Sequence, residues 1–201
     1  MTWPQRFARL ITDVTVRAPW LWPVVRRPMA RMFDRIAAQW DEATGPERMV
    51  AFEAALERVP GTPRRALDLG TGTGDGAIAI ARRWPTAEVL GIDVSAGMVE
   101  EARRKAPELR FEVGDASRVE SPDGSFDLVA MNNVIPFFDE LGRIVAPGGH
   151  LLLAFSRGDE TPIYVRPGLL RRGLERAGFD VGEELAAGPG TATVARRRGG
   201  R

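Results

Sequence analysis

From residue 65 onward, short apolar runs alternate with longer stretches that carry apolar residues at helical spacing. The short runs are typical of buried strands, and the longer stretches of amphipathic helices. Repeated alternation of this kind predicts an α/β fold with a doubly wound, mostly parallel sheet. The last two strands follow each other directly, which predicts an antiparallel edge. The expected strands are 66–69, 88–93, 110–113, 126–131, 150–156, 181–186 and 191–196, and the expected helices are 76–84, 96–105, 137–145 and 168–177.

The residues before this alternation predict a helical extension. Apolar residues recur at helical spacing from Met29 to Trp40, and 47–59 predicts a second helix. Residues 1–28 are less regular, because Pro19 and Pro23 interrupt any helix that begins before them. We therefore expect an N-terminal helical extension over 1–60, a ligand-binding domain over 61–197 and a frayed tail over 198–201.

A glycine-rich turn, RALDLGTGTGDG over residues 65–76, lies between the first expected strand and the first helix of this domain. Glycine has no Cβ, so its backbone can bend sharply and approach a ligand closely. The helix that follows directs its free N–H groups toward the same place. The turn therefore predicts a binding site for a nucleotide-like molecule.

Acidic residues end three successive strands near this turn. Asp68 lies in the first strand, Asp93 ends the second, 19 residues past Gly74, and Asp115 follows the third. An acid at the end of the second strand is typical of ribose binding, and the carboxyl ends of parallel strands meet at one edge of a sheet. A carboxylate at Asp68 disfavours a pyrophosphate and suits an ammonium group. Together the three acids favour a neutral or cationic adenosine ligand.

Five segments in order resemble the class I S-adenosylmethionine-dependent methyltransferases, of the type that acts on small molecules. They fall between Met32 and Arg197, and together they are far more specific than one glycine turn. The stretch between the fourth and fifth strands is shorter than is usual in that family. The segments are LDLGTGTG (67–74), GIDVSAGMVEEAR (91–103), VGDA (113–116), FDLVAMNNVIPFF (126–138) and IVAPGGHLLLAF (144–155).

The resemblance implies a seven-stranded Rossmann-like sheet, S-adenosylmethionine as cofactor and a lid that includes Trp40; an ordinary core position is the alternative for Trp40. It implies that Asp93 accepts hydrogen bonds from both ribose hydroxyls, and that Asp115 accepts one from the adenine amino group. Each acid could instead be a helix cap or a turn acceptor. The implied cofactor-binding residues are Trp40, Asp68, Gly70, Thr71, Gly72, Thr73, Gly74, Asp93, Val94, Met98, Asp115, Ala116, Asn132 and Val134.

The implied reaction is an in-line displacement, in which a nucleophile of a small-molecule substrate attacks the methyl group of the sulfonium. The protein then needs only to align the reacting atoms and exclude water, so a fixed base is optional. The loop after the fifth strand offers Asp159, Glu160 and Tyr164 as candidate bases. His150 is expected at the opposite edge of the sheet, too far from a ligand for general-base work. The sequence does not identify the methyl acceptor.

Composition narrows the alternatives. The chain has no cysteine and one histidine, which excludes disulfides and cysteine nucleophiles and predicts no metal site. A net charge of +1 argues against a nucleic-acid partner. No apolar run reaches the roughly 18 residues that a membrane span needs, and no signal peptide is evident, so a cytoplasmic location is expected.

The first 40 residues carry seven arginines and two acids, with tryptophans between them. Residues 1–28 are therefore expected either to pack on the domain or on a second subunit in a homo-oligomer, or to make a peripheral membrane contact.

Two other functions remain open at this stage. Gly72, Gly74 and Ala77 also satisfy the dinucleotide fingerprint, which would make the protein an NAD-dependent oxidoreductase. That interpretation gives Asp68 and Asp115 no role. The second alternative is a non-catalytic, methyltransferase-like binding subunit.

Overall fold

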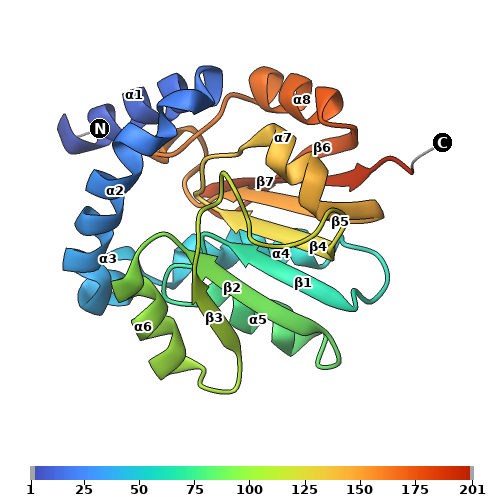
Figure 1. Cartoon of the computed structure of the whole chain (residues 1–201), viewed down its shortest axis with the longest axis horizontal. Coiled ribbons are helices and arrows are strands. Elements are labelled where there is room, and N and C mark those ends of the chain that lie inside the picture. The colour runs from blue at the N-terminus through green and yellow to red at the C-terminus, as the bar shows by residue number, and fades with distance from the viewer. Residues whose placement is uncertain (1–2, 200–201) are drawn as a thin grey trace.

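The computed structural model describes residues 3–199 and forms three layers, with a seven-stranded sheet between two sets of helices (Figure 1). The strand order is β3-β2-β1-β4-β5-β7-β6. Strands β1 to β5 are parallel, and β7 runs antiparallel to both of its neighbours. The predicted doubly wound sheet and antiparallel pairing are confirmed, with β6 as the edge strand. The strands are β1 Arg65–Leu69, β2 Glu88–Asp93, β3 Arg110–Val113, β4 Phe126–Asn132, β5 Val145–Phe155, β6 Phe179–Ala187 and β7 Gly190–Arg197.

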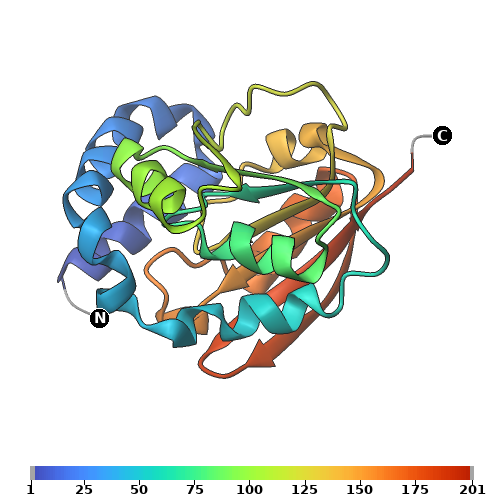
Figure 2. The same cartoon turned by 90° about the horizontal axis from the view of Figure 1, so that it is seen from below.

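Helices cover both faces of the sheet, and an additional group stands at one end of the molecule (Figure 2). In the described part of the chain, no helix is long and apolar enough to cross a membrane. The α-helices are α1 Trp3–Arg17, α2 Trp22–Ile36, α3 Trp40–Thr44, α4 Val50–Leu56, α5 Asp75–Arg83, α6 Ala96–Lys105, α7 Phe138–Ile144 and α8 Pro167–Arg176. Short 3₁₀ helices are η1 Pro19–Leu21, η2 Ala37–Gln39, η3 Pro46–Met49 and η4 Gly158–Glu160.

Two apolar cores follow from the period-two alternation of the central strands. In β4, Leu128 faces a core that also contains Phe52 of α4 and Ile80 of α5. The next residue, Val129, faces the opposite core with Leu174 of α8. Both faces of the central strands are buried, which explains why these strands are almost continuously apolar.

The helical group at the end of the molecule is fixed to the sheet through the start of α6. Ser95 caps this helix by accepting a hydrogen bond from the Met98 amide at 3.1 Å. Asp34 of α2 accepts from the Ser95 hydroxyl at 2.6 Å and from the Gly97 amide at 3.0 Å. A Cβ at Gly97 would lie 3.1 Å from the Asp34 Cα, so glycine permits this close approach. Helix α2 is thereby held beside the carboxyl end of β2.

Several predicted boundaries need correction in the N-terminal region. The helix expected from Met29 begins at Trp22, because Pro23 occupies the first turn, where no amide is needed. It ends at Ile36, and the short turn η2 separates it from α3. The expected helix 47–59 is a 3₁₀ turn followed by the shorter helix α4.

Two predictions near the other end of the chain also need correction. Strand β5 begins at Val145, before the glycines, because Val145 pairs with Phe126 and residues 146–149 form a bulge within the strand. The frayed tail does not begin at Arg198, whose amide donates to the Gly178 carbonyl at 2.9 Å. Residues 200 and 201 of that tail lie outside the described residues.

Candidate active site

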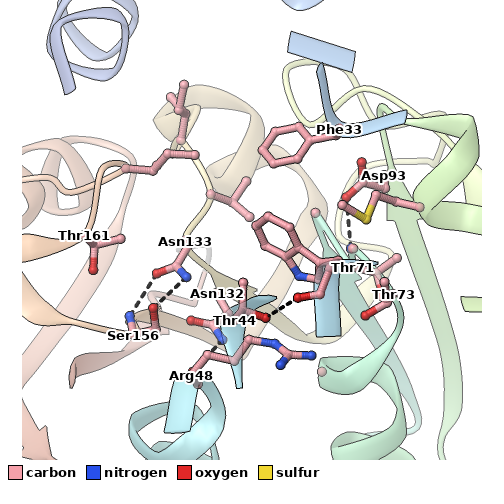
Figure 3. A pocket seen from close by; sticks show the side chains of 18 of the residues that line it. Phe33, Thr44, Arg48, Thr71, Thr73, Asp93, Asn132, Asn133, Ser156 and Thr161 are labelled. Carbon is pink, nitrogen blue, oxygen red and sulfur yellow. Dashed lines mark hydrogen bonds between the residues drawn. The ribbon is translucent and has the colours of Figure 1, made fainter. Parts of the chain in front are cut away.

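A cavity of about 740 Å³ opens where the carboxyl ends of the parallel strands meet α2 and α3. One side is formed by the glycine turn after β1 and by Asp93, and the other by Asn133 and Ser156 (Figure 3). Phe33 of α2 and Arg48 of η3 also line the cavity. We call the segment from α2 to η3, residues 22–49, the helical cover. Open parallel sheets bind ligands at this position, and the volume suits a nucleoside-sized molecule with space for a second small one.

The glycine turn is held against β2 by its own backbone. The Gly70 amide donates to the Ile92 carbonyl at 2.8 Å, and Gly70 has a φ of 73°. A Cβ at Gly70 would lie 2.3 Å from Val134 Cγ2, so glycine is needed there for packing as well as for conformation. At Gly72 the nearest atom to such a Cβ would be Trp40 Nε1, at 4.0 Å. The turn therefore packs tightly at Gly70 on the segment that follows β4, and it leaves bare backbone facing the cavity at Gly72.

Asp68 organises this turn from within. The side chain is 2% exposed, and its Oδ2 accepts from Thr71 Oγ1 at 2.6 Å and from the Ala77 amide at 2.8 Å. Burial raises the pKa of Asp68 to about 7, in opposition to these two hydrogen bonds. Asp68 lies in the cavity wall as predicted, but its carboxylate joins the turn to α5. Its contact with a ligand ammonium stays a prediction.

Asp93 connects the same turn to the end of β2. Its Oδ2 accepts from the Gly72 amide and its Oδ1 from the Ser95 amide, both at 2.9 Å. Burial raises the pKa of Asp93, in opposition to the amides of Ser95, Gly72 and Val94. Each carboxylate oxygen can accept more than one hydrogen bond, so Asp93 retains acceptor capacity toward the cavity.

Asp115, just after β3, is hydrogen-bonded to α2 and does not face the cavity as Asp93 does. Trp22 Nε1 donates to its Oδ1 at 2.7 Å, and Arg26 Nη1 donates to its Oδ2 at 2.5 Å. Burial opposes ionisation, but hydrogen bonds from Ser117, Arg26 and Trp22 together hold the pKa of Asp115 below its ordinary value. Ala116 lines the cavity, whereas Asp115 does not. Both Asp115 oxygens are hydrogen-bonded to α2, and the contact of Asp115 with an adenine amino group stays a prediction.

The helical cover places two aromatic rings beside the glycine turn. Phe33 and Trp40 meet edge to face, with ring centroids 5.6 Å apart and an interplanar angle of 79°. Both line the cavity, and Trp40 Nε1 is close to the bare backbone at Gly72. Trp40 therefore lies at the cavity beside the glycine turn, and its role as a lid over the cofactor stays a prediction.

A network of charged side chains fastens this cover to the turn. Arg48 Nη2 lies 2.7 Å from Asp41 Oδ1 and also pairs with Asp75, while Lys105 pairs with both acids. Thr73 Oγ1 donates to Asp41 at 2.6 Å. Burial would raise the pKa of Asp41, but Lys105, Thr73 and Arg48 hold it below its ordinary value. Of these residues, Arg48 and Lys105 were not expected at the site, because no motif places them beside the turn.

Two asparagines after β4 form the opposite wall. Asn133 has a φ of 59°, and its side chain exchanges two hydrogen bonds with Ser156, at 2.9 and 2.8 Å (Figure 3). Asn132 Nδ2 donates to the Arg48 carbonyl at 3.0 Å. The Asn132 Oδ1 is buried in the cavity wall and has no hydrogen-bond partner within the described residues.

The candidate bases are separated by the structure. Glu160 lines the cavity, whereas Asp159 and Tyr164 do not. Tyr164 is 9% exposed and packs on Phe155, with the Arg9 guanidinium 5.2 Å from its ring centroid. Burial raises the pKa of Tyr164, so the phenolate form that could accept a proton is scarcer at neutral pH. Glu160 is thus the one of the three that could reach a substrate.

His150 lies away from this cavity, as expected. It pairs with Leu128 and Arg196 in the sheet and lines a separate small hollow with Pro60 and Pro147. Burial and the nearby Arg196 lower the pKa of His150. The described residues also contain no group of three or more histidine, aspartate or glutamate side chains placed to hold a metal ion.

Comparisons with known proteins agree with this geometry. A family model described as a methyltransferase domain matches residues 66–149. A demethylmenaquinone methyltransferase of Deinococcus radiodurans is 38% identical over 138 residues, which are 61% of this chain and 57% of that protein. A malonyl-[acyl-carrier protein] O-methyltransferase of Halorhodospira halophila is 37% identical over 148 residues, 68% of this chain and 50% of that protein.

Among solved structures, a SAM-dependent methyltransferase from Aquifex aeolicus matches with a TM-score of 0.66 at 22% identity, over 80% of this chain and 97% of that one. The chain carries a class I S-adenosylmethionine-dependent methyltransferase domain. The chain spans about half the length of the curated relatives it matches. None of these comparisons supports the alternative of an NAD-dependent oxidoreductase.

The cavity of this methyltransferase domain fits the family's cofactor. Bare backbone at Gly72 and the carboxylate of Asp93 suit a ribose. Of the predicted cofactor-binding residues, Gly74 and Asp115 do not line the cavity. Those that do are Trp40, Asp68, Gly70, Thr71, Gly72, Thr73, Asp93, Val94, Met98, Ala116, Asn132 and Val134.

Proposed function

We propose that this protein transfers a methyl group from S-adenosylmethionine to a small-molecule acceptor. The observation that carries the proposal is the cavity in which the bare Gly72 backbone and Asp93 face the aromatic cover. Asp93 both fixes the turn and keeps acceptor capacity for two ribose hydroxyls. The matched relatives support the cofactor side of this assignment, because they share the domain although their names give different acceptors.

The protein's contribution to the reaction is to position and enclose the reactants. S-adenosylmethionine supplies a methyl group on a positively charged sulfur, which is already electrophilic. Trp40 would place its electron-rich ring near that charge, and Phe33 would exclude water together with it. Correct orientation alone can lower a barrier by about 7–11 kcal/mol. Glu160 is the side chain that could accept a proton from a nucleophile requiring deprotonation.

The acceptor site would lie between the aromatic cover and the wall formed by Asn133 and Ser156. This wall presents polar groups that are already hydrogen-bonded to each other, and Met29 and Ile163 add apolar lining to the same cavity. A partly apolar metabolite with one or two polar groups fits that combination best.

Two experiments test the proposal in sequence. Thermal unfolding with S-adenosylhomocysteine, S-adenosylmethionine or NAD reports which nucleotide binds, because a ligand at 100 times its Kd adds about 2.7 kcal/mol of stability. We expect a shift with the first two and none with NAD. Transfer of a radiolabelled methyl group is then screened against metabolites whose enzymes are encoded near this gene. Binding without transfer to any acceptor would favour the non-catalytic binding subunit.

A further inference from the structure

Helix α1 buries its threonines and packs Val16 against the core, but it exposes two of its aliphatic side chains. Thr12 and Thr15 are 0% and 1% exposed, whereas Leu10 is 59% and Val14 is 39% exposed. Steps of three and four residues place Leu10, Val14 and the exposed Arg17 on one side of the helix. A helix that served only to cover the protein would show the reverse arrangement, with its apolar side inward.

The segment that follows continues this arrangement. Trp20 in η1 is 75% exposed and Val24 in α2 is 72% exposed, whereas Trp22 between them is 5% exposed. Further steps of three and four residues lead to Arg27 and Arg31, which are both exposed. The inner side of α2 therefore contributes to the cavity, and its outer side presents apolar and basic side chains to solvent.

We name these outward residues the apolar–arginine face. It lies on the helical group that stands at one end of the molecule (Figure 2). Asp34, the acid of α2, is directed toward the start of α6, where it accepts hydrogen bonds from Ser95 and Gly97. The face consists of Leu10, Val14, Arg17, Trp20, Val24, Arg27 and Arg31.

We propose that the apolar–arginine face docks on the surface of an anionic lipid bilayer. Tryptophan is favoured at the level of lipid headgroups, and short aliphatic side chains on an amphipathic helix insert just below them. Arginines on the same face are attracted to anionic headgroups while their aliphatic stems lie along the apolar surface. A second copy of this chain would instead bring two sets of arginines together, which like-charge repulsion disfavours.

The test uses the full chain and vesicles that pellet on centrifugation. We expect co-sedimentation with phosphatidylcholine vesicles that contain about 30% phosphatidylglycerol and little with pure phosphatidylcholine, since the arginines need anionic headgroups. Replacing Arg27 and Arg31 by glutamine should weaken the binding roughly thirtyfold, at about fivefold for each lost charge. Val24→Ser should weaken it as well, by removing inserted apolar surface.

Matched control variants keep the same changes away from the face. Arg82→Gln with Arg172→Gln removes two exposed charges elsewhere, and Val113→Ser removes a 56% exposed valine in β3. Both controls should bind anionic vesicles within about twofold of the unchanged protein. All of these side chains are exposed, so folding should persist, and circular dichroism verifies it.

Two results would overturn the proposal. One is the absence of binding to anionic vesicles, or an equal loss in the face variants and their controls. The other is a dimer in light scattering that Val24→Ser dissociates, without any vesicle binding, which would assign the face to a second copy of the chain. Neither result depends on whether the cavity binds S-adenosylmethionine.

Discussion

Asp93 and Asp115 occupy equivalent places at the ends of neighbouring parallel strands, yet they are in opposite circumstances. The oxygens of Asp93 are held by two backbone amides of the nearby chain and face the cavity. The oxygens of Asp115 are held by Trp22 and Arg26, which come from a helix about 90 residues earlier in the sequence. The pKa of Asp93 is raised and that of Asp115 is lowered.

The difference shows what each arrangement is suited to do. A buried carboxylate with few partners gains when a ligand donates hydrogen bonds to it, because those bonds compensate for its desolvation. A carboxylate that already has a guanidinium and an indole N–H gains little from a further donor. We therefore expect Asp93 to bind a ligand and Asp115 to hold α2 in place.

The largest effect on stability and on ligand binding is expected at Gly70, in the glycine turn beside Asp93. Gly70→Ala would place a Cβ 2.3 Å from Val134 at a φ of 73°. Strain and overpacking together should lower the free energy of unfolding by about 3–4 kcal/mol and remove binding of S-adenosylhomocysteine. Urea denaturation and calorimetry measure the two losses.

The control for this variant is Gly61→Ala. Gly61 has a φ of 75°, but a Cβ added there would meet no other atom within 4 Å, so only the backbone cost of about 1 kcal/mol should remain. Equal destabilisation by the two substitutions would show that the contact with Val134 is unimportant.

The comparison itself is tested by the same substitution at both acids. Asp93→Asn should weaken S-adenosylhomocysteine binding by about 100-fold or more, because it removes charge-assisted hydrogen bonds to the ribose. Asp115→Asn should weaken it by less than about tenfold. Titration calorimetry gives both affinities. Equal losses would indicate that α2 releases Asp115 when the cofactor binds.

The neighbours of Asp93 could be predicted from the sequence better than the neighbours of Asp115, for a physical reason. The glycine turn, Asp93 and Ser95 are close in sequence or lie on paired strands, so their positions follow from the sheet. The partners of Asp115 depend on how a distant amphipathic helix packs, and periodicity does not specify that packing. The same limit explains why Arg48 was missed.

The predicted boundaries of helices and strands also differ in accuracy according to whether local sequence or pairing sets them. The boundaries of α6 and β3 were predicted correctly, since a serine cap and charged flanking residues mark them. The start of β5 was predicted too late, because the glycines indicated a turn and only the pairing of Val145 with Phe126 reveals a bulge.

A third prediction concerns Asp68, which supports the turn beneath Asp93. Its pKa in the folded state is about 7, above the ordinary value of 3.8, so the folded chain binds more protons than the unfolded chain between these two values. Stability should therefore fall as the pH rises toward 8, by about 2 kcal/mol from pH 5. Urea denaturation at several pH values measures the slope.

Asp68→Asn is the matching variant, because an amide oxygen can accept from both Thr71 and Ala77 without titrating. Its stability should vary much less over the same pH range. A slope as steep as that of the unchanged protein would assign the pH dependence to another group.

The smallest effect is expected at the contact between Arg26 and Asp115, whose side chains are 37% and 17% exposed. Because the pKa of Asp115 is lowered in the folded state, this contact stabilises the protein at neutral pH and is lost as the pH falls below the ordinary value of 3.8. Arg26→Gln should therefore lower the free energy of unfolding by about 1 kcal/mol at pH 7 and by much less at pH 3. Arg27→Gln, a neighbouring exposed arginine, should change it by less than about 0.5 kcal/mol at either pH. If Arg26→Gln costs the same at both pH values, the ion pair does not hold the cover, and Trp22 alone would have to explain why Asp115 is closed to the cavity.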